Sequence, residues 1–171
     1  MLYASLLLLT QCSHGKQGDP SPVSQLPPAT QTGANTFGCL VNGRAYVPGG
    51  NDGTPNFVLL YEPGVQRSGF NILTYRKDGG YQDMNLYCGW TMPLQKRAFA
   101  IGLPVVEASG LYTGPAGDFD NDGGLKYRHG QLVITRLDEQ AGVIAGTFEF
   151  TSVNTRGDTL KVTQGRFDSK L

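Results

Sequence analysis

Three aspartates in one short loop are the residues of this chain whose spacing could support metal chemistry. Asp118, Asp120 and Asp122 stand at alternate positions and are followed by two glycines. Alternate carboxylates in a D-x-D-x-D-G loop can converge on a hard cation such as calcium. His129 stands where an EF-hand has its closing bidentate glutamate, and no helices are predicted around the loop, so it is not an EF-hand. An Asp/Asn/Gly loop is also typical of a solvated surface turn, which is the interpretation we favour.

His129 is also the histidine that a catalytic interpretation would need. A hydrolase would orient it against a carboxylate of the acidic loop 118–124, but no serine of the chain lies in a G-x-S-x-G elbow. Cys39 and Cys88 each stand alone, so zinc-binding spacing is absent. We therefore predict no catalytic residue and no resident cofactor. The alternative is an envelope hydrolase, or a calcium-dependent module, that uses residues 118–124 and His129.

A short apolar run that ends at Cys12 predicts a membrane anchor. Residues 6–9 are four consecutive leucines, followed by Thr10 and Gln11. A run of this length is typical of a signal-peptide core and is too short to span a bilayer as a helix. The arrangement resembles a bacterial lipoprotein signal, in which the cysteine becomes the lipidated first residue of the mature chain. A buried strand or a frayed terminus is the alternative interpretation.

The anchor divides the chain into three parts. We assign residues 1–11 to a signal peptide remnant, whose natural start we expect upstream of Met1. Residues 12–35 carry almost no large apolar side chains, so we predict a lipidated cysteine and a flexible tether there. Residues 36–171 form one all-β domain. Without Cys12, the remaining Cys39 and Cys88 both fall on the apolar parity of their strands, and we predict a disulfide between them in an oxidising envelope.

Composition limits the classes of partner. Glycine occurs 24 times, and charged residues make up 16% of the chain, which favours a turn-rich β protein. Lysine plus arginine and aspartate plus glutamate number 14 each, so the charge balance attracts the chain neither to nucleic acid nor to an anionic surface. The partners that remain are the membrane, reached through the lipid anchor, and a protein or glycan. We expect a monomer.

Residues 131–168 predict a three-stranded meander. Apolar residues alternate with polar ones after Ile144, which is the period of a strand with one buried face. A three-residue loop with Gly157 in a left-handed conformation would place Phe150 opposite Val162, so that apolar residues pair. The preceding strand would then bring Leu132 near Phe148.

A bulge is predicted in the last strand. Phe167 has the wrong parity for the core, and an extra residue at Gln164–Gly165 would return it to the buried side. It could then cover Gly146, which has no side chain to pack. The register of the whole meander therefore follows from its apolar pattern.

The upstream residues predict further short strands. Asn42-Gly43 marks a hairpin with a type I′ turn, and apolar alternation recurs at 57–61, 70–74, 84–92, 99–103 and, more weakly, 111–113. Trp90 could line a carbohydrate site, although its parity places it in the core. Helical periodicity is absent. We predict an antiparallel β-sandwich or closed barrel of about eight to ten short strands.

Two stretches carry a resemblance to a known family. LPPATQTGANTFGCLVNGRAYVPGG and AGVIAGTFEFTSVNTRGDTLKVTQGRFD together resemble a lipoprotein family of Bacteroidota-type bacteria that is classed as a domain of unknown function. The resemblance implies a lipid-anchored, all-β protein of the outer membrane, facing the periplasm or exposed at the cell surface. It implies no activity, so a binding or structural module is the function that we expect.

Overall fold

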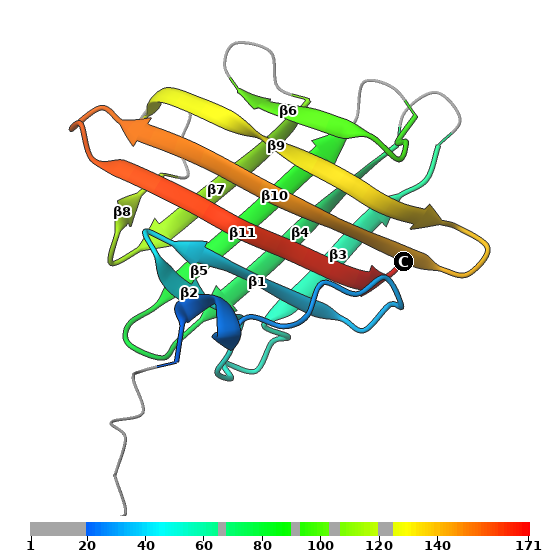
Figure 1. The fold of residues 1–171 in the computed structure, drawn as a ribbon, viewed down its shortest axis with the longest axis horizontal. Coiled ribbons are helices and arrows are strands. Elements are labelled where there is room, and N and C mark those ends of the chain that lie inside the picture. Colours follow the sequence, from blue (N-terminus) through cyan, green and yellow to red (C-terminus); the bar gives the residue numbers. More distant parts are fainter. Residues whose placement is uncertain (1–19, 65–67, 90–92, 103–106, 120–124) are drawn as a thin grey trace, which may run out of the picture.

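The computed structural model describes residues 20–64, 68–89, 93–102, 107–119 and 125–171, with the backbone alone for 125–127. The described chain is almost entirely β-structure (Figure 1). Its elements, in order, are the 3-10 turn η1 (Pro22–Gln25) and the strands β1 (Thr36–Val41), β2 (Arg44–Tyr46), β3 (Phe57–Glu62), β4 (Gly69–Arg76), β5 (Gln82–Gly89), β6 (Ala98–Gly102), β7 (Ala108–Gly114), β8 (Gly117–Asp118), β9 (Leu125–Asp138), β10 (Val143–Asn154) and β11 (Thr159–Lys170).

The strands form one curled sheet in the order β2-β1-β11-β10-β9-β6-β7-β5-β4-β3, with β8 paired to β7. Among the described residues, the pairings between strands are antiparallel except for the short contact of β6 with β7. Figure 1 shows β9, β10, β11 and β1 lying across β7, β5, β4 and β3, so the sheet curls into a half-barrel. The all-β prediction is confirmed, whereas neither the sandwich nor the closed barrel is.

Aromatic residues fill the concave side of the half-barrel. Phe37 of β1 lies with its ring centroid 6.3 Å from that of Phe57 of β3. Phe70 of β4 and Phe167 of β11 have centroids 5.6 Å apart. Strands that are far apart in the sheet order therefore meet across one core, and burial of these rings stabilises the curl.

The C-terminal meander has the predicted register. Phe150 pairs with Val162, Ser152 pairs with Leu160, and Phe148 pairs with Leu132. Gly157 has φ of 90°, as the three-residue loop requires. The apolar pattern therefore set the register correctly.

The predicted bulge in β11 is also confirmed. The pairing shifts between Phe148, opposite Gly165, and Phe150, opposite Val162. Gln164 takes φ of 55°, a left-handed conformation that a bulge can impose on a non-glycine residue. Phe167 returns to the core with 2% of its surface exposed, and its ring lies over Gly146.

The predicted hairpins are present as well. Asn42 and Gly43 have φ of 47° and 79°, which is the type I′ turn, and Cys39 pairs with Tyr46 across it. In the next hairpin Phe57 pairs with Thr74 and Tyr61 with Phe70. These local pairings depend on turns that the sequence encodes.

The N-terminal part of the described chain corrects one prediction. Residues 26–35, which we call the strap, were expected to belong to the flexible tether. Leu26 is buried, and the carboxylate of Asp168 in β11 accepts hydrogen bonds from Thr30 Oγ1 (2.6 Å), Thr32 N (2.9 Å) and Gly33 N (2.7 Å). The strap is therefore docked on the sheet, because one buried carboxylate satisfies several of its donors.

Strand number and length also differ from the prediction. The described residues hold eleven strands rather than eight to ten, and β9 has 14 residues. The end of the meander near the C-terminus is also covered on its other side by the strap. Gly33, for instance, lies against Val143 and Lys170.

Candidate functional site

A pocket opens at one end of the concave side of the half-barrel, and we call it the end pocket. It has a volume of about 690 Å³, within the range of small-molecule sites.

The lining comes from η1, from the β1–β2 and β4–β5 turns and from the residues after β7, and it comprises Pro22, Gln25, Val41, Asn42, Gly43, Arg44, Ala45, Tyr46, Arg76, Asp78, Gly79, Gln82, Tyr112, Pro115 and Ala116. Mouths of β-barrels are common places for ligand sites.

Two buried tyrosines in this lining have their hydroxyl groups engaged. The Tyr46 hydroxyl lies 3.0 Å from Thr74 Oγ1, which donates to the Met84 carbonyl. The Tyr112 hydroxyl donates to Gln82 Oε1 at 3.2 Å. Burial raises the pKa of both phenols, so they stay protonated at neutral pH. Because Gln82 accepts through its oxygen, its amide NH₂ group is left as a donor.

Two arginines give the end pocket its charge. Arg76 Nη1 donates a hydrogen bond to the Ala45 carbonyl at 2.8 Å, which holds the Arg76 guanidinium against β2. Ala45 is the residue that follows Arg44 in the chain. Arg44 is exposed. Within the described ranges neither arginine forms an ion pair, and Asp78 is the carboxylate that lines the same pocket. The site can therefore donate several hydrogen bonds to a negatively charged group.

The residues that line the end pocket were not predicted from the sequence. The alternation of side chains along the strands could have indicated two of them. Arg76 and Gln82 continue the buried faces of β4 and β5 beyond Thr74 and Met84. A polar residue at a core position near a strand end marks the rim of a barrel. Only the curl of the sheet brings these strand ends to one place.

The acidic loop lies largely outside the described residues. Asp120 and Asp122 are not described, and Asp118 is an exposed residue of β8 whose Oδ1 accepts a hydrogen bond from Thr113 Oγ1 at 3.3 Å. Among the residues that are described, no three His, Cys, Asp or Glu side chains gather as a metal site. Calcium binding by this loop stays a hypothesis that rests on its sequence.

His129 lies on the convex face of the sheet. It is exposed, pairs with Thr151, and lines a hollow of about 450 Å³ together with Glu149 and Lys161. Glu149 also accepts a hydrogen bond from Gln131 Nε2 at 3.2 Å. The carboxylate that shares this hollow with His129 is thus Glu149, which the hydrolase hypothesis did not include.

The two core cysteines correct the disulfide prediction. Cys39 and Cys88 are both fully buried in the same core, as expected, but both are free thiols. Cys39 Sγ lies 3.7 Å from Met84 Sδ. Met84 precedes Cys88 by four residues on β5, which corresponds to roughly 13 Å along a strand. Burial of Cys39 and Cys88 in the same core therefore did not mean that the two thiols lie close together.

Three features predicted from the sequence lie outside the described residues. They are the lipidated Cys12, the signal peptide remnant and Trp90. No helix in the described part of the chain is long and apolar enough to cross a membrane.

Searches against protein-family models, curated proteins and solved structures found no match to this chain.

Proposed function

We propose that this protein is a lipid-anchored module of the bacterial cell envelope that binds a small polar ligand in the end pocket. The observation that carries the binding proposal is the pocket itself, which combines a volume of about 690 Å³ with two arginines that lack ion pairs in the described structure. A concave site with a few convergent polar groups is the usual form of a ligand site.

The anchoring part of the proposal rests on the sequence around Cys12. Acyl chains contribute roughly 0.8 kcal/mol per buried CH₂ group, so a lipidated cysteine would hold the domain at the outer membrane, on its periplasmic or outer side. A sandwich-like packing of the two halves of the sheet would make the domain a rigid support for the pocket. The ligand would then be bound close to a membrane.

Membrane fractionation with intact-mass analysis tests the anchor. Wild-type protein should enter the detergent phase with the added mass of acyl chains, and the Cys12→Ala variant should be found in the aqueous phase. If the Cys12→Ala variant partitioned into detergent like the wild type, the anchor would lie elsewhere and this part of the proposal would be wrong.

Native mass spectrometry tests the pocket. Protein purified from its own envelope should carry a bound small molecule, and an Ala116→Trp variant, whose new side chain fills the pocket, should not. Ala116 is a partly exposed lining residue that packs against the edge of the core, so the melting temperature of the variant is measured to check that the fold is kept. Equal bound mass on both proteins would place the ligand site elsewhere, for example in the hollow beside His129.

A further inference from the structure

The donors of the end pocket point to the charge of its ligand. Arg44 and Arg76 contribute two guanidinium groups, and Gln82 contributes an amide NH₂ group. Asp78 supplies one carboxylate, so the charged groups of the lining sum to about +1 by their ordinary ionisation. Guanidinium groups bind phosphate and carboxylate oxygens through paired N–H donors. The pocket therefore suits an anionic group.

The place of the pocket in the chain indicates where that anion would come from. Pro22 and Gln25 of η1 line the pocket, and η1 lies against β2. Cys12 precedes Pro20 by only eight residues, and eight residues span at most about 29 Å. Since the strap is docked on β11, the chain between anchor and pocket is much shorter than a tether of residues 12–35 would be.

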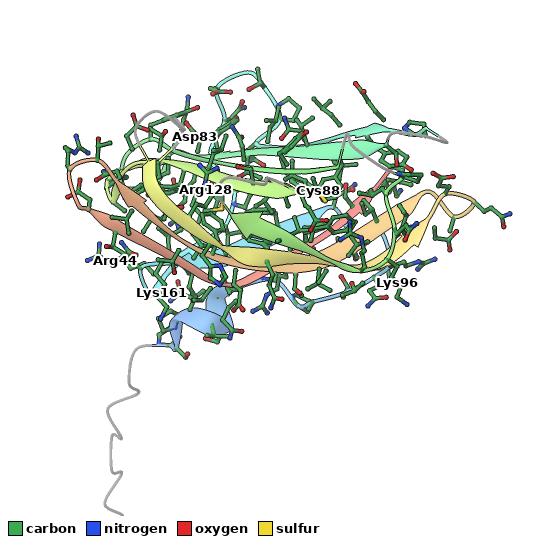
Figure 2. The ribbon with its side chains drawn as sticks, turned by 90° about the horizontal axis from the view of Figure 1, so that it is seen from above. Arg44, Asp83, Cys88, Lys96, Arg128 and Lys161 are labelled. Carbon is green, nitrogen blue, oxygen red and sulfur yellow. The ribbon has the colours of Figure 1, made fainter. Side chains whose placement is uncertain are left out.

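Side chains around η1 fit a membrane surface. Val23 of η1 has 40% of its surface exposed, which is unusual for an apolar residue of this domain. Figure 2 shows Arg44 and Lys161 on the same side of the molecule as η1, whereas Lys96 lies at the opposite end. The chain has no net charge, so attraction to an anionic surface has to come from a local group of cations such as Arg44 and Lys161.

We propose that the end pocket binds the phosphate group of an anionic lipid headgroup in the membrane that carries the anchor. This inference rests on the proposed function and specifies its ligand. Arg44 and Arg76 contact the phosphate oxygens, and Gln82 donates a further hydrogen bond. A soluble phosphate ester has the same chemistry, so the two sources must be separated by experiment.

Vesicle co-sedimentation of the full chain with Cys12→Ser tests the proposal without a lipid anchor. This protein should bind vesicles that contain phosphatidylglycerol and not vesicles of phosphatidylcholine alone. Arg44→Gln should weaken binding about fivefold, as expected for loss of one cation near an anionic surface. Lys96→Gln, which removes the same charge at the opposite end, should leave binding unchanged. Asp78→Asn should strengthen binding.

Two further arms separate the pocket from general electrostatics and from a soluble ligand. Ala116→Trp keeps every charge but fills the pocket, so it should abolish binding while its melting temperature stays near that of the Cys12→Ser protein. Glycerol 3-phosphate, titrated into the protein, should bind more weakly than phosphatidylglycerol vesicles. Binding of the soluble ester alone, without vesicle binding, would overturn the lipid assignment.

Other outcomes also decide the matter. Equal losses for Arg44→Gln and Lys96→Gln, or full vesicle binding by Ala116→Trp, would show non-specific attraction and overturn the inference. The proposed function fails separately, since it predicts a ligand on the wild-type protein by native mass spectrometry whether or not that ligand is a lipid.

Discussion

At the scale of single residues, Phe148 is the side chain on which the meander depends most. It is 3% exposed, its ring stacks on Phe37 with centroids 5.2 Å apart, and it covers Gly165. Phe148→Ala should lower the free energy of unfolding by about 3–5 kcal/mol, because it leaves a cavity among these groups. Thr147 is exposed on the other face, so Thr147→Ala should cost far less. Denaturant midpoints measure both, and equal losses would contradict the assignment of faces.

The free thiols lead to a second prediction at this scale. Burial raises the pKa of Cys39, and it raises that of Cys88 to about 12, so neither forms a reactive thiolate at neutral pH. In the Cys12→Ala protein, a thiol reagent should label neither cysteine in the folded state and both after denaturation without reductant. A denatured protein that still resisted labelling would contain the disulfide, contrary to this structure.

At the scale of elements, the docking of the strap depends on Asp168. Burial alone would raise the pKa of this carboxyl group, but hydrogen bonds from Thr30 and from the amides of Thr32 and Gly33 outweigh it and lower the pKa below its ordinary value. A carboxyl group whose pKa is lower in the folded protein than in the unfolded chain stabilises the fold. This stability is fully present above the pKa of the unfolded chain and is lost as the pH falls through the pKa of the folded protein.

Asp168→Asn should therefore destabilise the protein at pH 7, by about 1.5–3 kcal/mol for hydrogen bonds to a charged group. The difference from wild type should shrink as pH falls below about 4, where the unfolded carboxyl group begins to protonate. Thermal unfolding across this range measures it. Comparing the two proteins isolates Asp168 from other acids with lowered pKa values, and a difference that did not depend on pH would contradict the role of its charge.

The bulge in β11 is a second element that can be tested. A Cβ atom at Gly165 would lie 2.4 Å from the Phe148 carbonyl oxygen, so Gly165→Ala should be strongly destabilising. Gln164 has φ of 55°, and Gln164→Gly should be neutral or stabilising by up to about 1 kcal/mol, because glycine tolerates this conformation. Melting temperatures of the two variants should move in different directions, and similar losses would mean that the bulge lies elsewhere.

At the scale of the whole molecule, the half-barrel creates the end pocket from strand ends that the sequence does not place together. Arg44 follows the first hairpin turn, while Arg76 ends β4 and Tyr112 lies in β7. The hydrogen bonds of Arg76 with the Ala45 carbonyl and of Tyr46 with Thr74 hold the β1–β2 hairpin near the end of β4. The proposed ligand site is in this sense a property of the curl.

The sequence by itself determined the all-β class, the hairpins and the register of the meander. These features depend on short loops and on a side-chain period of two, so that each pairing is fixed by residues close in sequence, as at Phe150 and Val162. The bulge at Gln164 and the return of Phe167 followed from the same pattern.

Only the tertiary structure decided the docking of the strap, the separation of the cysteines and the position of the pocket. Gly33 and Asp168 are 135 residues apart, and no local pattern indicates that one binds the other. Parity placed Cys39 and Cys88 in one core, but parity gives the face of a strand and not the position along it. The direction and degree of sheet curl arise from packing summed over many strands, which no short stretch of sequence encodes.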